Sequence, residues 1–220
     1  KKDQPRVPIT ARLVADMIEV AGADRYMTMD LHAGQIQGFF SIPGDVLTGF
    51  YILTDYLKTI KDTLHNPVVV TADLGFAKKA RNYAAALHLP LAFIEKRRLA
   101  NNAKAEALSI IGDVKDRDVL LVDDEINTGG SISQAVHLIK ENGARDVYIS
   151  FVHAIFSPDA VQRLAALPVK QFITTDTVPV PPERAAAFGD RLKVLSVAPL
   201  LGEVIHRANE GRSVGELFNE

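Results

Sequence analysis

Two adjacent acids end an apolar run near the middle of this 220-residue chain, and small residues follow them. The stretch reads VLLVDDEINTGGSI from Val119, with the acids at Asp123 and Asp124. A turn of small residues that leads into a helix exposes backbone N–H groups, which suit a phosphate monoester. Carboxylates cannot bind phosphate, but they accept hydrogen bonds from sugar hydroxyls and ligate hard cations such as Mg²⁺. The stretch therefore indicates a sugar-phosphate site.

The turn from Thr128 to Ser131 supplies the groups for the phosphate. Gly129 and Gly130 let an anion approach the backbone, and the two flanking hydroxyls add donors. The alternative is an ordinary strand-to-helix turn in which Asp, Asn and Gly serve only as caps. The order of apolar run, two acids and small residues favours the phosphate site.

The elements that must position these residues follow from the hydrophobic spacing, which alternates between helical periods and short apolar runs. This alternation predicts an α/β fold, a parallel sheet with helices on both faces. Expected strands are 25–31, 67–73, 90–94, 118–124, 146–154 and 170–176, and expected helices are 10–20, 76–88, 131–141 and 158–167. The Pro-rich stretch 176–190 indicates an ordered linker or surface loop.

Ligands of parallel sheets lie beyond the carboxyl ends of the strands. The chemistry should therefore follow Leu31, Thr71, Ile94 and Val122, and polar residues come after each of them.

Composition excludes several classes of function. The net charge of −2 is spread along the chain, which argues against nucleic acid and anionic membranes as partners. The absence of cysteine excludes disulfides, iron–sulfur clusters and thiolate zinc. Apolar runs are far shorter than a membrane span, so we expect a soluble, cytoplasmic protein of one large or two small domains.

Three further segments carry a family resemblance: KKDQPRVPITARLVADMIEVAGADR from Lys1, MDLHAGQIQGFFSIP from Met29 and SVAPLLGEVIHR from Ser196. With the Asp123 stretch, they make nearly the whole chain resemble the ribose-phosphate pyrophosphokinase family. The first two segments are specific, because transferases that merely use the activated sugar do not share them. The resemblance implies a phosphoribosyltransferase-type parallel sheet in two tandem lobes.

Family members carry a further N-terminal half-domain before the position of Lys1. We therefore expect residues 1–50 and 194–220 to form what is left of an incomplete first lobe. Residues 51–193 should form a complete second lobe that carries the ribose 5-phosphate loop.

The family reaction would transfer the diphosphoryl group of ATP to the anomeric hydroxyl of ribose 5-phosphate, with Mg²⁺ as cofactor. By resemblance, the substrate-binding residues would be Asp123, Asp124, Asn127, Thr128, Gly129, Gly130, Ser131, Gly75 and Lys78, with Lys79 beside them. ATP would meet Lys1, Lys2, Asp3 and His32. The metal ligands would be His32 and Asp73, although His32 could instead contact water or an ATP phosphate.

The segment IEKRR, from Ile94, resembles the start of the family's mobile catalytic loop. Lys96 would stabilise the charge of the transferring phosphoryl group, and Arg98 would contact the substrates. The resemblance also implies a homo-oligomer, a hexamer built from dimers in the complete protein.

Two residues depart from the family pattern. Asn127 stands where the family pattern DDxxDT has aspartate, and Phe76 replaces a glycine in the pyrophosphate-contacting turn. Two alternatives to the kinase stay open, and these departures support the first of them. One is a non-catalytic relative that assembles with active subunits, and the other is a phosphoribosyltransferase that consumes the activated sugar through the same loop.

Overall fold

The computed structural model describes the backbone of residues 6–98 and 106–218, and the side chains of residues 6–95 and 108–218. No helix within these ranges is both long enough and apolar enough to cross a membrane.

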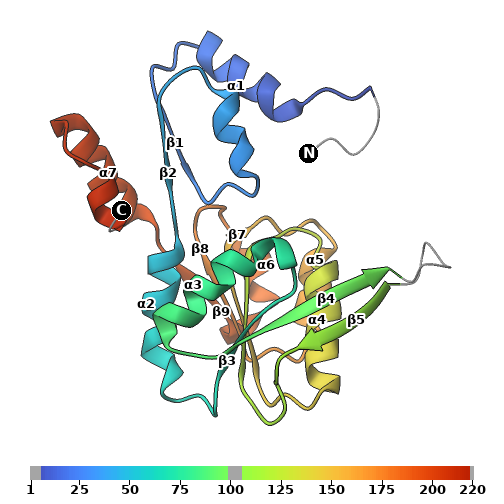
Figure 1. The fold of residues 1–220 in the computed structure, drawn as a ribbon. Helices are drawn as coiled ribbons and strands as arrows, with labels where there is room; N and C mark the ends of the chain where they lie inside the picture. Colours follow the sequence, from blue (N-terminus) through green and yellow to red (C-terminus); the bar gives the residue numbers. More distant parts are fainter. Residues whose placement is uncertain (1–5, 99–105, 219–220) are drawn as a thin grey trace. The chain divides into compact units, whose positions relative to one another are not determined.

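The chain forms two compact units (Figure 1). The first consists of residues 1–49 together with 198–220, so two distant stretches of sequence build it. The second is the continuous stretch 50–197.

A seven-stranded sheet forms the centre of the second unit, in the order β5-β4-β3-β6-β7-β8-β9. The strands are β3 (Val68–Thr71), β4 (Leu91–Arg98), β5 (Glu106–Ile111), β6 (Val119–Ile126), β7 (Val147–Ala154), β8 (Gln171–Thr175) and β9 (Leu192–Leu195). Neighbouring strands are parallel except for β4 and β5, which are antiparallel. The predicted α/β fold with a parallel sheet is confirmed, and the antiparallel β5 at one edge is the departure from it.

Helices cover both faces of this sheet. They are α2 (Phe50–Lys61), α3 (Ala77–Leu87), α4 (Gly130–Glu141), α5 (Ala160–Ala165) and α6 (Pro182–Ala186), with single turns η2 (Leu74–Phe76) and η3 (Gly189–Arg191). Each face of the sheet has its own hydrophobic core, and successive residues of a strand point into the two cores in turn. Val68 packs on the side of α4 and α5, and Val69 packs on the side of α2 and α3. The central strands therefore read as solid apolar runs because both of their faces are buried.

The apolar run of β6 shows the scale of this burial. Leu120 and Leu121 are both 0% exposed and belong to opposite cores. Fully burying one such side chain stabilises the fold by ~1.5–3 kcal/mol. The strand is thereby held firmly in place up to the acids that follow it.

The first unit is smaller. Its elements are α1 (Thr10–Val20), β1 (Tyr26–Met29), η1 (Gly34–Phe39), β2 (Gly44–Leu47), α7 (Ala198–Glu210) and η4 (Gly215–Phe218). The strands β1 and β2 form a parallel pair. Leu47 packs with Val204 and Phe218, so the core of this unit joins both of its stretches.

The sequence did not predict α2, β2, β5, β9 or α7, and the ends predicted for two strands came too early. Strand β4 continues past Ile94 to Arg98 because it pairs antiparallel with β5, and backbone hydrogen bonds of that hairpin hold polar residues in extended form. Strand β6 continues past Asp124 to Ile126 because β7 pairs with it through Ile126 and Ala154. The segment 176–190 is ordered, as expected, and includes α6.

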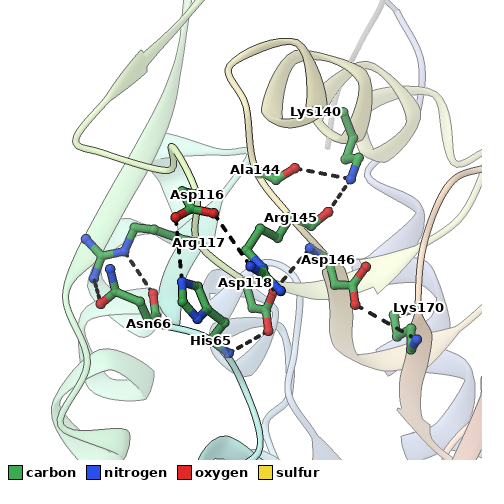
Figure 2. A network of polar contacts seen from close by, with 10 residues as sticks. All are labelled: His65, Asn66, Asp116, Arg117, Asp118, Lys140, Ala144, Arg145, Asp146 and Lys170. Atoms are coloured by element: carbon green, nitrogen blue, oxygen red, sulfur yellow. Dashed lines mark hydrogen bonds and ion pairs between the residues drawn. The ribbon is translucent and has the colours of Figure 1, made fainter.

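A polar network lies where β3, β6 and β7 begin, at the end of the sheet opposite the acids (Figure 2). Its centre is the buried Asp118, whose carboxylate accepts hydrogen bonds from the backbone N–H groups of His65 (2.7 Å) and Asp146 (3.1 Å). Arg145 Nε lies 3.9 Å from the same carboxylate. Asp118 therefore ties together the segments that enter three neighbouring strands.

Asp118→Asn should lower the free energy of unfolding by about 2 kcal/mol, because the amide presents N–H groups toward a buried backbone donor that needs an acceptor. Urea denaturation measures this loss. The matched control is Asp116→Asn, since the Asp116 side chain is 73% exposed and its ion pairs with His65 and Arg145 are both 3.7 Å long. The control should change stability by less than about 0.5 kcal/mol. Equal losses in both variants would contradict the role of Asp118.

Candidate active site

Three carboxylates gather where β3 and β6 end. Asp73 follows β3, and Asp123 and Asp124 lie in β6. The two strands are adjacent and parallel, so their carboxyl ends share one edge of the sheet. After burial and the neighbouring Asp124, the charge of Asp73 is the smallest of the influences on the pKa of Asp123, and it acts to raise it. The structure thus brings together site residues that lie far apart in the sequence.

Asp123 is the most perturbed of the three. Burial, followed by the neighbouring charge of Asp124, raises the pKa of Asp123 from its ordinary value of 3.8 to about 7. The backbone N–H of Asp124 donates to Asp123 Oδ1 at 2.9 Å and partly offsets this rise. The ionised form of Asp123 is therefore destabilised in the folded chain, and a hydroxyl donor or a cation placed beside it would relieve that destabilisation.

The loop between β6 and α4 contains the two glycines that the sequence analysis assigns to an anion site. Gly129 has φ of +72°, in the left-handed region, and a Cβ atom there would lie 3.0 Å from Leu164 Cδ2. Gly130 begins the twelve-residue helix α4, and a Cβ atom there would meet only Thr128 Oγ1, at 3.7 Å. Glycine is thus required at the first position by both conformation and space, and at the second by neither.

The turn after β3 is capped by its own acid. Asp73 Oδ1 accepts the N–H of Gly75 at 2.9 Å, so this amide is already engaged. Phe76 points into the core on the side of α2 and α3, and Lys79 Nζ lies 5.5 Å from its ring centroid. Lys78 is exposed in the first turn of α3. Lys78 and Lys79 therefore both offer exposed cationic side chains for a pyrophosphate contact, whereas the Gly75 N–H is occupied.

His32 lies in the first unit, after β1, on an exposed segment. Nearby, Asp30 has φ of +43° and accepts the N–H of Gly49 at 2.6 Å, which links the end of β1 to the end of β2. The other predicted metal ligand, Asp73, belongs to the second unit. Each unit therefore contains one of the two predicted ligands.

Within the ranges that the structure describes, no group of three or more His, Asp or Glu side chains is arranged to hold a metal ion. Mg²⁺ commonly takes one or two carboxylates and fills its other positions with water and substrate phosphate. The exposed Asp73 beside Asp123 fits this mode, because both supply oxygen and their negative charges lie together.

For five other predicted site residues, the structure describes either the backbone alone or nothing. Lys1, Lys2 and Asp3 lie outside the described residues. Lys96 and Arg98 lie in β4, where only their backbone is described.

The structure adds a support for the loop that the sequence analysis missed. The segment after β7 runs beside the loop, and α5 packs against it through Leu164. Arg163 in α5 donates to the carbonyl of Thr128, 35 residues earlier in the chain. No sequence pattern marks this contact, because only the fold brings the two segments together.

Comparison with known proteins extends this picture. The family described as the phosphoribosyl synthetase-associated domain matches residues 98–219. A ribose-phosphate pyrophosphokinase of Caldanaerobacter subterraneus subsp. tengcongensis is 47% identical over 99% of this chain and 67% of its own length. The enzyme of that name from a Nostoc species is 48% identical over 99% of this chain and 64% of its own length.

A solved structure of the same family resembles this chain in fold. The crystal structure of phosphoribosylpyrophosphate synthetase from Mycobacterium smegmatis superposes with a TM-score of 0.85 and 41% identity, over 96% of this chain and 67% of that one. This chain spans about two thirds of the length of the relatives it matches. With the family match over more than half of the chain, these likenesses show that it belongs to the ribose-phosphate pyrophosphokinase family of enzymes.

Proposed function

We propose that the protein transfers the diphosphoryl group of ATP to ribose 5-phosphate. The anomeric oxygen attacks the β-phosphorus, the bond from that phosphorus to the α–β bridging oxygen breaks, and AMP leaves with the bridging oxygen. The hydroxyl proton is released, and the product is phosphoribosyl pyrophosphate. Positioning and charge stabilisation supply most of the rate in such transfers.

The observation that carries this proposal is the juxtaposition of a glycine loop and a perturbed acid in the second unit. The loop from Asn127 to Ser131 would bind the 5-phosphate through its N–H groups and the start of α4. Asp123 would accept a hydrogen bond from a ribose hydroxyl, and Asp124 would keep it oriented through the bond to Oδ1. This unit would then be the lobe that carries the ribose 5-phosphate loop.

The other roles rest on the family resemblance. Asp73 and His32 would hold Mg²⁺, which neutralises charge on the ATP phosphates when bound. Gly75 and Lys78 would lie near the pyrophosphate, Lys96 and Arg98 would stabilise the transferring group, and Lys1, Lys2, Asp3 and His32 would meet ATP. The active protein would be a homo-oligomer.

Calorimetric titration of the 220-residue chain tests the substrate assignment. Ribose 5-phosphate should bind more tightly than inorganic phosphate, and ribose should bind most weakly, because both the loop and Asp123 take part. Equal affinities for ribose 5-phosphate and inorganic phosphate would remove the sugar contact from the proposal. AMP release from ATP that depends on ribose 5-phosphate distinguishes the kinase from a transferase that consumes the activated sugar.

Asn127→Asp should tighten ribose 5-phosphate binding by on the order of 1 kcal/mol, because a charged acceptor makes stronger hydrogen bonds to hydroxyls than an amide does. Binding of inorganic phosphate should weaken or stay the same, since the loop gains a negative charge. Titrations of both ligands on both variants measure the two effects. Equal ribose 5-phosphate affinities would show that Asn127 serves only as a cap.

A further inference from the structure

We infer that Arg163 is a positioning residue for phosphate binding, which it serves by fixing the orientation of the peptide that joins Thr128 to Gly129. The inference rests on the proposed function, since it concerns the same loop. It goes further because Arg163 lies outside that loop, on α5.

Three consecutive carbonyl groups, of the last residue of β6 and the first two residues of the loop, are held from one side. The N–H of Phe156 donates to Ile126 at 3.0 Å, and the N–H of Ser157 donates to Asn127 at 3.0 Å. The third carbonyl, of Thr128, accepts a hydrogen bond from Arg163 Nη1 at 2.5 Å. All three carbonyls therefore turn toward the segment 156–163.

Because the peptide bonds are trans, the direction of the three carbonyl groups also fixes the direction of the three N–H groups that follow them. In each planar trans peptide the C=O and the following N–H point in opposite directions. The N–H groups of Asn127, Thr128 and Gly129 must then point away from the segment 156–163. They form a row of donors beside the start of α4, which is the arrangement that binds an anion.

The third peptide is the one that needs a side chain to hold it. The first two carbonyls accept backbone N–H groups, which no side-chain substitution removes. The third peptide precedes Gly129, whose freedom to take either sign of φ lets a neighbouring peptide rotate at low energy. The guanidinium opposes that rotation, because a charge-assisted hydrogen bond to the carbonyl is lost when the peptide turns over.

The helix that carries Arg163 is itself held in place. Its neighbour Leu164 is buried and packs directly beneath Gly129. Arg191 donates to the carbonyls of Ala165 (2.6 Å), Leu167 (3.1 Å) and Val169 (3.3 Å), which holds the end of α5. The short helix thus presents Arg163 to the loop from a rigid support.

The test compares Arg163→Met and Arg163→Lys with the wild-type chain. Arg163→Met should raise the dissociation constants of ribose 5-phosphate and inorganic phosphate by the same factor, about tenfold, because the loop contacts the phosphate that both ligands share. Lysine keeps the charge but not the fork of donors, so Arg163→Lys should recover only part of the loss. The matched control is Gln162→Ala, an exposed neighbour on the same helix, which should bind both ligands as the wild type does.

Two readouts separate positioning from a general loss of structure. Guanidinium chloride, far below denaturing concentrations, should restore phosphate binding to Arg163→Ala but not to Gly129→Val. In the ligand-free chain, Arg163→Met should shift or broaden the Gly129 amide resonance while Gln162→Ala leaves it unchanged.

The results test the role of Arg163 separately from the proposed function. Wild-type affinity in Arg163→Met, or an unchanged Gly129 resonance, would overturn the role of Arg163. If the wild-type chain binds neither ligand, the proposed function fails, and the Gly129 resonance of the ligand-free variants still decides whether Arg163 fixes the peptide.

Discussion

Asp123→Asn should stabilise the folded chain at neutral and alkaline pH and should weaken ribose 5-phosphate binding at the same time. The folded state raises the pKa of Asp123 from 3.8 to about 7, so it holds the proton more tightly than the unfolded state does. The stability that this proton contributes is fully present below the unfolded pKa and is lost as pH rises through the folded pKa. Asparagine resembles the protonated acid and cannot ionise.

The expected gain at about pH 8 is on the order of 2–4 kcal/mol, and it should shrink toward zero near pH 4. Asparagine retains Oδ1 as an acceptor for the N–H of Asp124, so the local hydrogen bond survives. Urea denaturation of both variants across this range measures the difference. Asp55→Asn, an exposed acid on α2, is the control and should show no such trend. A gain that does not vary with pH would rule out ionisation of Asp123 as its cause.

The loss of binding follows from the same charge. An ionised carboxylate accepts stronger hydrogen bonds from hydroxyls than an amide does. Asp123→Asn should therefore weaken ribose 5-phosphate binding while binding of inorganic phosphate is kept or improved. This outcome would place Asp123 among the groups whose function is obtained at the expense of stability.

Gly129→Val should be among the most damaging single substitutions in the second unit. Gly129 has a φ that β-branched residues rarely adopt, and its added Cβ would lie 3.0 Å from the buried Leu164. Backbone strain and the displaced core side chain together should lower stability by on the order of 3 kcal/mol. Phosphate binding should be lost, because the loop can no longer hold its N–H groups in place. Urea denaturation and phosphate titration measure the two losses.

The neighbouring glycine provides the stability control. Gly130 has ordinary helical conformation and open space around its Cα, so Gly130→Ala should change stability by less than about 1 kcal/mol, in the stabilising direction. Equal destabilisation by both substitutions would mean that the loop does not need the left-handed conformation at Gly129.

The place of Asp123 and of the glycine loop in the fold could be predicted because both follow directly after a buried apolar run. The run Val119 to Val122 is apolar on both faces, so the polar residues that follow it are expected near the end of the strand. The apolar run by itself therefore predicts that Asp123 and the glycine loop lie at the carboxyl edge of the sheet. The predicted strand end is two residues too early, because pairing of Ile126 with Ala154 of β7 extends β6 past its acids.

The missed features depend on contacts that no local pattern encodes. Strand β9 (Leu192–Leu195) lies at a sheet edge with two exposed residues in its middle, so its sequence lacks a buried run. Strand β5 exists through antiparallel pairing with β4. Arg163 looks like an ordinary helix-surface residue until the fold places it beside Thr128.

The split construction of the first unit has a consequence for how the chain is made. Both cores of the second unit contain only residues between 50 and 197, so that unit can fold as soon as this stretch has left the ribosome. Leu47, by contrast, packs against Val204 and Phe218, which are translated on the order of ten seconds after Leu47 itself. The core of the first unit therefore cannot be completed until α7 and the residues after it have been translated, and a ribosome that stops before α7 releases a folded second unit attached to an unfinished first unit.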